Sequence, residues 1–397
     1  MTTLRGALLA FTALAGLAGP AAAETAPSAL SLLTDLRVRH ETYDAGGKDA
    51  EALTARLRLG AETRKVAGFS ALAEVEAIGA LVDDYADGVR PRPWDAVIPD
   101  PEIVELNRAQ LTWAPDPAFS AVVGRQRLVL NNARFVGNSG WRQNEQTFDA
   151  AKVSWTPAAS VSLTYAYIDD VRRSTGRDHP QGAWRSDSHL LQADLAAGKD
   201  ARLSAYAYQL DFRNAPAQSS NTVGVRAAGK RPLRHGLALS WEAEIARQTD
   251  AGHNPADYRA DYGLLAAGLA AERWSAGLGI EQLGGDGRNA FQTPLASLHG
   301  FQGWSDVIGA TPADGLRDLY LRGARTFAAP RPVKLSGELH EFRDDTGARR
   351  YGRELDAAIS APLRKGVSVE AGVARFETDS RLYPDATRTW LTLELKR

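Results

Sequence analysis

The sequence predicts an all-β fold, a transmembrane antiparallel up-and-down β-barrel of about 18 strands. Three observations predict it: alternating apolar and polar residues in eighteen segments, alternating short and long connections, and aromatic residues near the segment ends. The alternation indicates strands with one apolar face. Most segments are close to the ~9–11 residues that a tilted strand needs to cross a bilayer.

The clearest segment is 53–62, where every odd position is apolar and every even position is polar or glycine. The same period of two recurs along the chain. We expect strands near residues 33–42, 52–62, 69–81, 104–114, 119–127, 148–156, 161–169, 188–196, 201–212, 221–229, 237–247, 258–270, 274–282, 316–327, 333–342, 352–361, 367–376 and 387–396.

The connections between these segments indicate which end of the barrel faces the periplasm. Eight short turns lie near 63–68, 114–118, 156–160, 196–200, 229–236, 271–274, 328–332 and 361–366; nine longer loops include 82–103, 128–147, 170–187 and 283–315. An even strand number with both termini on the short-turn side is the layout of an outer-membrane barrel with periplasmic termini. Strand 119–127 carries Arg125 and Arg127 on its apolar parity, so it needs a bulge or leaves the membrane there.

The composition of the apolar face separates this fold from a soluble alternative. That face is rich in Ala, Leu and Gly, and aromatic residues expected to form an interfacial girdle lie near strand ends: Tyr43, Phe69, Trp113, Phe119, Trp155, Trp274 and Trp390. A soluble periplasmic β-helix or sandwich would carry more Val, Ile, Leu and Phe on its core face. The girdle therefore favours the barrel.

The N-terminal segment predicts export. Arg5, a short apolar stretch and Ala21-Ala22-Ala23 read as a secretory signal peptide, 1–23, followed by one barrel domain, 24–397. The chain has no cysteine, which excludes a lipoprotein, a disulfide framework and a thiolate metal site. A net charge of −1 gives no indication of nucleic-acid binding, but 39 of the 47 basic residues are arginines, the cation that pairs bidentately with carboxylate and phosphate.

If the apolar parity faces lipid, the other parity faces the lumen. This parity supplies basic candidates for pore lining from several strands: Arg37, Arg39, Arg56, Arg58, Arg108, Lys152 and Arg226. Acidic residues of the late strands, such as Glu242 and Glu354, share it. Two interpretations stay open. The charges form ion pairs that hold the barrel wall, or the arginines form a ladder for an anionic solute, as basic rings do in anion-selective pores.

The segment 125–146 supplies the other candidates. It is rich in arginines and amides, and a loop of this polarity can fold inward, narrow a channel and hydrogen-bond a polyhydroxylated, anionic solute; a solvent-exposed outer loop is the alternative. The candidates are Arg125, Arg127, Asn131, Asn132, Arg134, Arg142 and Gln143.

Three stretches resemble the alginate-export family of outer-membrane proteins. They are GRQRLVLNNARFVGNSGWRQNEQTFDA (124–150), FQTPLASLHGFQGWSDVIGATPADGLRDLYL (291–321) and, more weakly, LRVRHETYD (36–44). The resemblance implies an eighteen-stranded, monomeric barrel in the bacterial outer membrane, with an electropositive lumen that passes an anionic polysaccharide such as alginate or related solutes. By motif position, Arg125, Arg127, Arg134 and Arg142 would line or gate the channel.

The sequence gives no signal for an enzyme, a cofactor or a metal centre. The histidines form no HExxH pair, and there is no GxSxG elbow. Outer-loop residues Asp83, Asp84, Asp344 and Asp345 could bind Ca²⁺, although solvated loop charge is the simpler account.

We therefore expect a channel for anionic or sugar-like solutes, in contact with outer-membrane lipid, lipopolysaccharide and the barrel-assembly machinery, and no nucleic acid. The alternatives are a soluble periplasmic β-protein that binds or trims acidic polysaccharide, and a plugged structural barrel.

Overall fold

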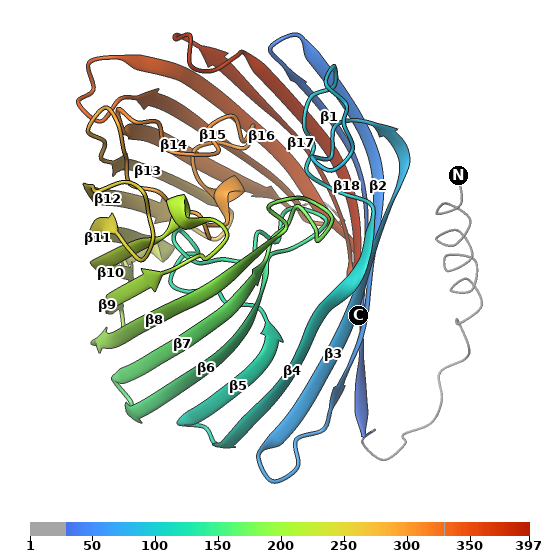
Figure 1. The fold of residues 1–397 in the computed structure, drawn as a ribbon, viewed down its shortest axis with the longest axis vertical. Coiled ribbons are helices and arrows are strands. Elements are labelled where there is room, and N and C mark those ends of the chain that lie inside the picture. Colours follow the sequence, from blue (N-terminus) through green and yellow to red (C-terminus); the bar gives the residue numbers. More distant parts are fainter. Residues whose placement is uncertain (1–28, 329) are drawn as a thin grey trace.

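The computed structural model describes residues 29–328 and 330–397, so the expected signal peptide lies outside the described residues. Eighteen strands form one sheet (Figure 1). They are β1(Leu30–Ala45), β2(Lys48–Thr63), β3(Phe69–Asp84), β4(Ile103–Asp116), β5(Phe119–Gln126), β6(Thr147–Ala158), β7(Val161–Arg172), β8(Ala183–Ala197), β9(Ala201–Leu210), β10(Ser220–Pro232), β11(Ala238–Asp250), β12(Arg259–Ala270), β13(Trp274–Leu283), β14(Leu316–Phe327), β15(Val333–Arg343), β16(Arg350–Arg364), β17(Val367–Thr378) and β18(Ala386–Lys396).

The sheet closes into a barrel. Every strand pairs antiparallel with its neighbours in sequence, and β1 pairs with both β2 and β18. Closure leaves no free sheet edge, which a membrane requires because lipid cannot satisfy unpaired backbone groups. In the part of the chain that the structure describes, three short 3₁₀ segments lie outside the strands, at Pro216–Gln218, Arg234–Gly236 and Leu298–Gly300. Within the described residues, no helix is long and apolar enough to cross a membrane.

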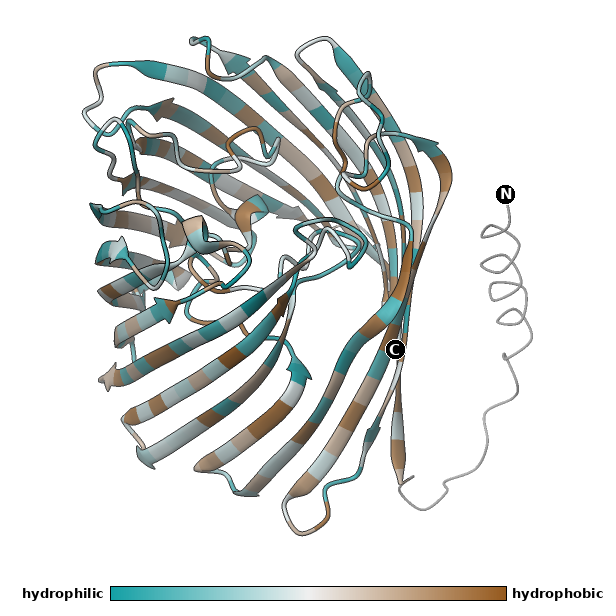
Figure 2. Ribbon diagram, viewed as in Figure 1, coloured by the Kyte–Doolittle hydropathy of each residue, from teal (hydrophilic) through white to brown (hydrophobic). Residues whose placement is uncertain are grey.

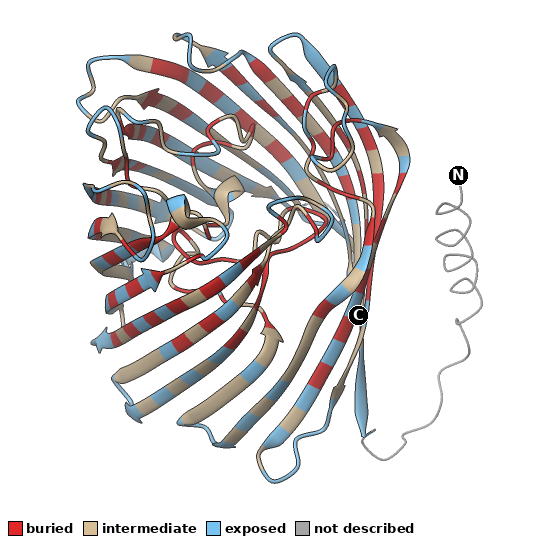
Figure 3. Cartoon of the chain, viewed as in Figure 1, coloured by how far each residue is buried: buried red, intermediate tan, exposed pale blue. Residues whose placement is uncertain are grey.

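The apolar parity of the strands faces outward, as predicted. Hydrophobic and hydrophilic residues alternate along the strands (Figure 2), and so do exposed and buried ones (Figure 3). Exposed apolar side chains include Val123 on β5, Ile245 on β11 and Leu355 on β16. Arg56 on β2 and Glu244 on β11 have the opposite parity and are buried inside. An inside-out distribution of this kind is what a lipid solvent selects.

Most of the predicted aromatic girdle is present at the short-turn end. Trp113 stacks on Phe69 with ring centroids 6.0 Å apart and meets Phe119 edge-on at 5.4 Å. The placement of Tyr43 and Trp390 in this girdle is wrong. Trp390 stands between the inward-facing Arg388 and Thr392 and is buried, and Arg388 covers the Tyr43 ring at 4.0 Å, so both rings face the interior.

All eighteen predicted strands are confirmed, but one outer connection is shorter than expected. The strands β1 and β2 extend to residues 45 and 48, so a two-residue hairpin replaces the expected loop. Gly46 and Gly47 occupy it with φ of 62° and 78°, values that a two-residue hairpin of this kind requires and that glycine adopts without strain.

The strand β5 ends where its sequence pattern becomes irregular. It pairs with β6 residue for residue up to Gln126, and Arg127 already lies beyond it. The strand therefore leaves the sheet after Gln126, one of the two outcomes expected from the parity of Arg125 and Arg127. The loop that follows, residues 127–146, turns into the barrel.

Candidate functional site

The loop 127–146 lies inside the barrel, as the sequence suggested it could (Figure 1). From this loop, Arg142 donates to Glu41 of β1 at 3.2 Å, and the side-chain amide of Gln143 donates to Thr54 Oγ1 of β2 at 2.9 Å. Asn107 of β4 donates to Glu145 at 2.7 Å. Because these contacts reach three strands of the wall, the loop narrows the lumen.

A second loop, residues 284–315 between β13 and β14, folds inward and packs on the first. The two loops form a parallel bridge between Val136 and Leu295, with Gly137 N donating to Leu295 O at 2.8 Å. Ser297 N donates to Ala133 O at 3.1 Å. Glycine is needed at 137 because a Cβ there would lie 2.3 Å from Ser297 Oγ. The two loops therefore form one inner unit.

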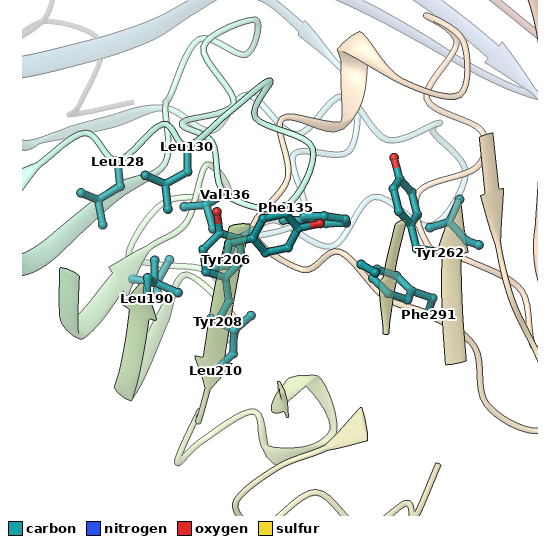
Figure 4. Close-up of a cluster of buried hydrophobic side chains, with 14 of the residues drawn as sticks. Leu128, Leu130, Phe135, Val136, Leu190, Tyr206, Tyr208, Leu210, Tyr262 and Phe291 are labelled. Carbon is teal, nitrogen blue, oxygen red and sulfur yellow. The ribbon is translucent and has the colours of Figure 1, made fainter. Parts of the chain in front are cut away.

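An apolar cluster attaches this inner unit to the wall (Figure 4). The Phe135 ring of the first loop lies 5.7 Å from Tyr206 of β9, 5.1 Å from Tyr262 of β12 and 5.6 Å from Phe291 of the second loop. Burial of an aromatic side chain contributes roughly 1.5–3 kcal/mol. The cluster thus fixes both loops on the side of the barrel opposite to β1–β3.

Ion pairs hold the rest of the inner unit. Arg134 is fully buried, contacts Glu281 of β13 at 2.6 Å and lies over the Phe301 ring at 4.9 Å. Arg142 reaches Asp306 of the second loop at 2.7 Å. Arg127 binds Glu145 with two donors.

The loop carboxyl groups are held in their charged form. Burial by itself would raise the pKa of Glu145, but Arg58, Arg127 and Asn107 outweigh it and lower that pKa to about 2. Burial acts in the same way on Asp306, where His299, Arg142 and Arg388 bring the pKa well below its ordinary value. At neutral pH both carboxylates therefore contribute stability to the closed arrangement.

A cavity of about 630 Å³ remains beside the inner unit. One side consists of the two loops, with Trp141, Phe301 and His299, and of a third loop, 173–182, with Arg173 and Thr175. The other side consists of inward-facing residues of β11–β15: Glu242, Leu264, Glu281, Asp318, Tyr320, Arg322, Glu338 and His340. Its size falls in the range of about 300–1,000 Å³ that is typical of small-molecule sites.

Each carboxylate in the cavity wall has a basic partner. Glu242 accepts from Arg226 at 2.8 Å, and the Glu281 and Asp306 pairs are those described above. Asp318 and Glu338 share His340, at 2.9 and 3.2 Å.

Two arginines in the same wall have no carboxylate partner among the described residues, Arg173 and Arg322. Arg173 stacks on Trp184 at 3.8 Å and donates to Pro294 O at 2.7 Å, while Arg322 lies over the Tyr320 ring at 4.6 Å. Burial lowers the pKa of Arg173 to about 10, which still leaves it charged at neutral pH.

The arginines predicted on the strands lie inside the barrel, and each forms an ion pair with a carboxylate. Arg37 contacts Glu394 at 2.8 Å, Arg39 lies 3.9 Å from Glu41, Arg56 contacts Asp35 at 2.5 Å, Arg58 binds Glu76, Arg108 contacts Glu74 at 2.8 Å and Arg226 binds Glu242. Lys152 also faces inward and makes no ion pair within the described part of the chain, but it does not line the cavity.

The amide candidates have mixed positions. Asn132 lines the cavity and donates to Glu242 at 2.7 Å. Gln143 is buried against β2 outside it. Asn131 lies in a turn, where its backbone adopts a left-handed φ of 51°.

The assignment of Arg125 to the pore is wrong. Its parity is that of Val123, which is exposed on the outer face, and its guanidinium binds Asp149 of β6 at 2.7 Å. Arg125 therefore lies on the outside of the barrel.

Sequence reasoning missed Arg173, Arg322 and the aromatic lining. Parity along 316–327 places Arg322 inside, but the irregular alternation of that segment obscured it. No local pattern signals that the 173–182 loop turns toward the cavity. Across residues 29–328 and 330–397, no group of three or more His, Asp or Glu side chains is arranged to hold a metal ion.

The barrel is similar in fold to several solved protein structures. The barrel is similar to that of OccAB4 of Acinetobacter baumannii, with a TM-score of 0.73, 13% identity, and coverage of 93% of this chain and 98% of that one. It is also similar to OpdL of Pseudomonas aeruginosa, with a TM-score of 0.70, 20% identity, and coverage of 93% and 98%. OpdK of the same organism, solved with vanillate, has a TM-score of 0.71 at 13% identity over 92% and 98%.

Among curated proteins, none matches this sequence. The family model described as alginate export matches residues 39–284, more than half of the chain. The family is one of alginate-export outer-membrane proteins and not of enzymes, and the matched OpdK is an outer membrane protein, which overturns the soluble periplasmic alternative. This chain belongs to the alginate export family and is a porin-like barrel of the bacterial outer membrane.

Proposed function

We propose that this protein is a passive outer-membrane channel for small anionic or polyhydroxylated solutes, and that Arg173 and Arg322 give it a preference for anions. The observation that carries the proposal is the charge pattern of the 630 Å³ cavity. Each carboxylate in the cavity wall is paired with a basic side chain. Among the described residues, the guanidinium groups of Arg173 and Arg322 have no carboxylate partner. A fixed cation in a narrow, low-dielectric passage attracts anions and repels cations.

The rest of the lining suits a hydroxylated carboxylate. Trp141, Phe301 and Tyr320 add aromatic surface to the lining, which a sugar or an aromatic ring could contact. Thr175 Oγ1 is buried and has no hydrogen-bond partner within the described residues, so a solute hydroxyl could supply one. Alginate, named by the family description, is a polymer of uronates, and the vanillate of the OpdK structure is also a carboxylate. The cavity volume favours a monomer or short oligomer over a polymer.

The test is the reversal potential of single channels in planar bilayers under a KCl gradient. We expect an anion-favouring potential for the unmodified barrel, and a permeability ratio near one for Arg173→Gln with Arg322→Gln. The matched control is Lys152→Gln, which removes one inward-facing charge outside the cavity and should retain the preference for anions. Monomeric uronate should block the unmodified channel more strongly than the double variant.

Two results would overturn the proposal. A channel that conducts but favours cations, or whose selectivity is unchanged in the double variant, would reject these arginines as the source of selectivity. A correctly folded barrel without conductance would favour the plugged, structural alternative, in which the inner unit closes the lumen. Heat-modifiable migration on gels establishes folding in each case.

A further inference from the structure

The outer face of β15–β17 carries arginines where the lipid-facing surface ends. Leu321 of β14, Leu339 of β15, Leu355 of β16 and Arg375 of β17 form one row across the sheet, because they are successive register partners. The three leucines are 55%, 51% and 55% exposed. Arg375 thus stands level with side chains that face lipid.

The next row toward the long loops is charged. Leu319, Glu341, Arg353 and Glu377 are its successive register partners. Arg353 and Arg375 are therefore diagonal neighbours on adjacent strands, with Cα atoms about 7–8 Å apart, within reach of long side chains that converge on one group.

Neither of these two arginines is closely held by a carboxylate. Arg353 lies 3.4 Å from Glu341, which Arg343 already engages at 2.8 Å. Arg375 donates to Thr387 Oγ1 at 2.6 Å and lies 3.9 Å from Glu377, whose side chain is 72% exposed. The side chains of Arg353 and Arg375 are 60% and 49% exposed.

Two other outward-facing arginines, Arg125 and Arg247, differ in this respect. Arg125 binds both oxygens of Asp149, at 2.7 and 2.8 Å, and Arg247 binds both oxygens of Asp261, at 2.7 and 3.1 Å. These forks are occupied by a single carboxylate each. The guanidinium groups of Arg353 on β16 and Arg375 on β17 retain N–H donors without a close carboxylate. They lie beside an apolar surface, where a cation without a close counter-charge is unfavourable.

We propose that Arg353 and Arg375 clamp a phosphate group of the phosphorylated glycolipid that forms the outer leaflet of the bacterial outer membrane. The long loops mark the outer side, so this pair lies at the outer boundary of the apolar band. Two guanidinium forks match the oxygens of a phosphate, and basic clusters at this level bind anionic head groups. The leucine row below provides contact for the acyl chains.

The test measures the binding of lipid A to the purified full barrel in detergent, with native mass spectrometry as the readout. The probes are diphosphorylated lipid A, its dephosphorylated form, and inorganic phosphate as a competitor. We expect Arg353→Gln with Arg375→Gln to weaken binding of the diphosphorylated form by at least about tenfold, because the loss of one charge-assisted hydrogen bond has that effect and the variant loses two guanidinium groups. The control, Arg125→Gln with Arg247→Gln, should change binding less than about twofold, because those forks are already occupied.

Three results would overturn the proposal. They are equal binding by the variant and the unmodified barrel, equal binding of the phosphorylated and dephosphorylated lipids, and displacement of the lipid by micromolar inorganic phosphate, which would indicate a site for the free ion. The lipid comparison uses the unmodified protein, so the proposal stays testable even if the double variant fails to fold. Channel conductance is independent of this surface and should be unchanged.

Discussion

The two sides of the lumen use arginine differently. On the side of β1–β4, the guanidinium groups of Arg37, Arg56 and Arg108 contact carboxylates at 2.5–2.8 Å. On the side of β11–β15, the cavity contains Arg322, and Arg173 faces it from a loop, both without such a partner in the described chain. A paired arginine presents little net charge to a passing ion. Pairing, not abundance, therefore distinguishes the wall that supports the loops from the wall that faces the solute.

The largest effect should follow from breaking a pair of the supporting kind. Arg134→Ala leaves the buried Glu281 carboxylate with Tyr262 and Gln302 as hydrogen-bond donors but without its cation. Removal of one partner of a buried ion pair costs about 3–5 kcal/mol. We expect the inner unit to detach, seen as larger, fluctuating single-channel conductance and as protease cleavage within residues 127–146.

A double variant sharpens this test. Arg134→Ala with Glu281→Ala removes both charges, so it should recover much of the closed, steady conductance that the single variant loses. If Arg134→Ala alone gave the steady conductance of the unmodified channel, the pair would not hold the loop, and the aromatic cluster around Phe135 would be sufficient.

Acid should release the same loop more gradually. The pKa of Glu145 is lowered to about 2, so its pair with Arg58 and Arg127 contributes stability above the ordinary carboxyl pKa of ~4.3 and loses it as pH falls through about 2. The lowered pKa of Asp306 acts in the same direction. We expect steady conductance from pH 7 to about 4, and growing fluctuation between about pH 3 and 2.

The variant Glu145→Gln is the control for the acid effect. It lacks the titrating group, so it should fluctuate already at neutral pH and change less on acidification. Steady conductance of the unmodified channel down to pH 2 would show that these carboxylates do not govern the loop.

The fold could be predicted from the sequence because its signals are local. A period of two, repeated eighteen times, depends on nearest neighbours in the strand, and loop lengths set which end is which. The inward position of Arg37 or Arg226 follows from parity alone. Parity also excludes Trp390 from the girdle, although its place near a strand end suggested otherwise. Leu391 and Leu393 have the opposite parity to Trp390 and are exposed on the outer face.

The charge state of the lumen could not be predicted in the same way, because pairing across the barrel is not local. Arg134 and Glu281 are 147 residues apart, and Arg37 and Glu394 are 357 apart. The sequence therefore left two interpretations of its arginines, structural pairs or a solute ladder. The structure favours pairs for those on β1–β4, and leaves the ladder to residues such as Arg173, whose inward position depends on a loop.

The smallest expected effect tests the boundary between the inside and the outside of the barrel. Arg125→Gln removes a charge from the segment that resembles the family motif, but the side chain lies on the outer face and binds Asp149. Ion pairs at the protein surface typically contribute about 0–1 kcal/mol, and this half-buried pair on the outer face does not point into the lumen. We expect Arg125→Gln to leave the reversal potential unchanged, whereas Arg173→Gln should reduce the preference for anions. A shift as large as that of Arg173→Gln would mean that Arg125 reaches the conduction path, and that motif position is a better guide to the pore than strand parity.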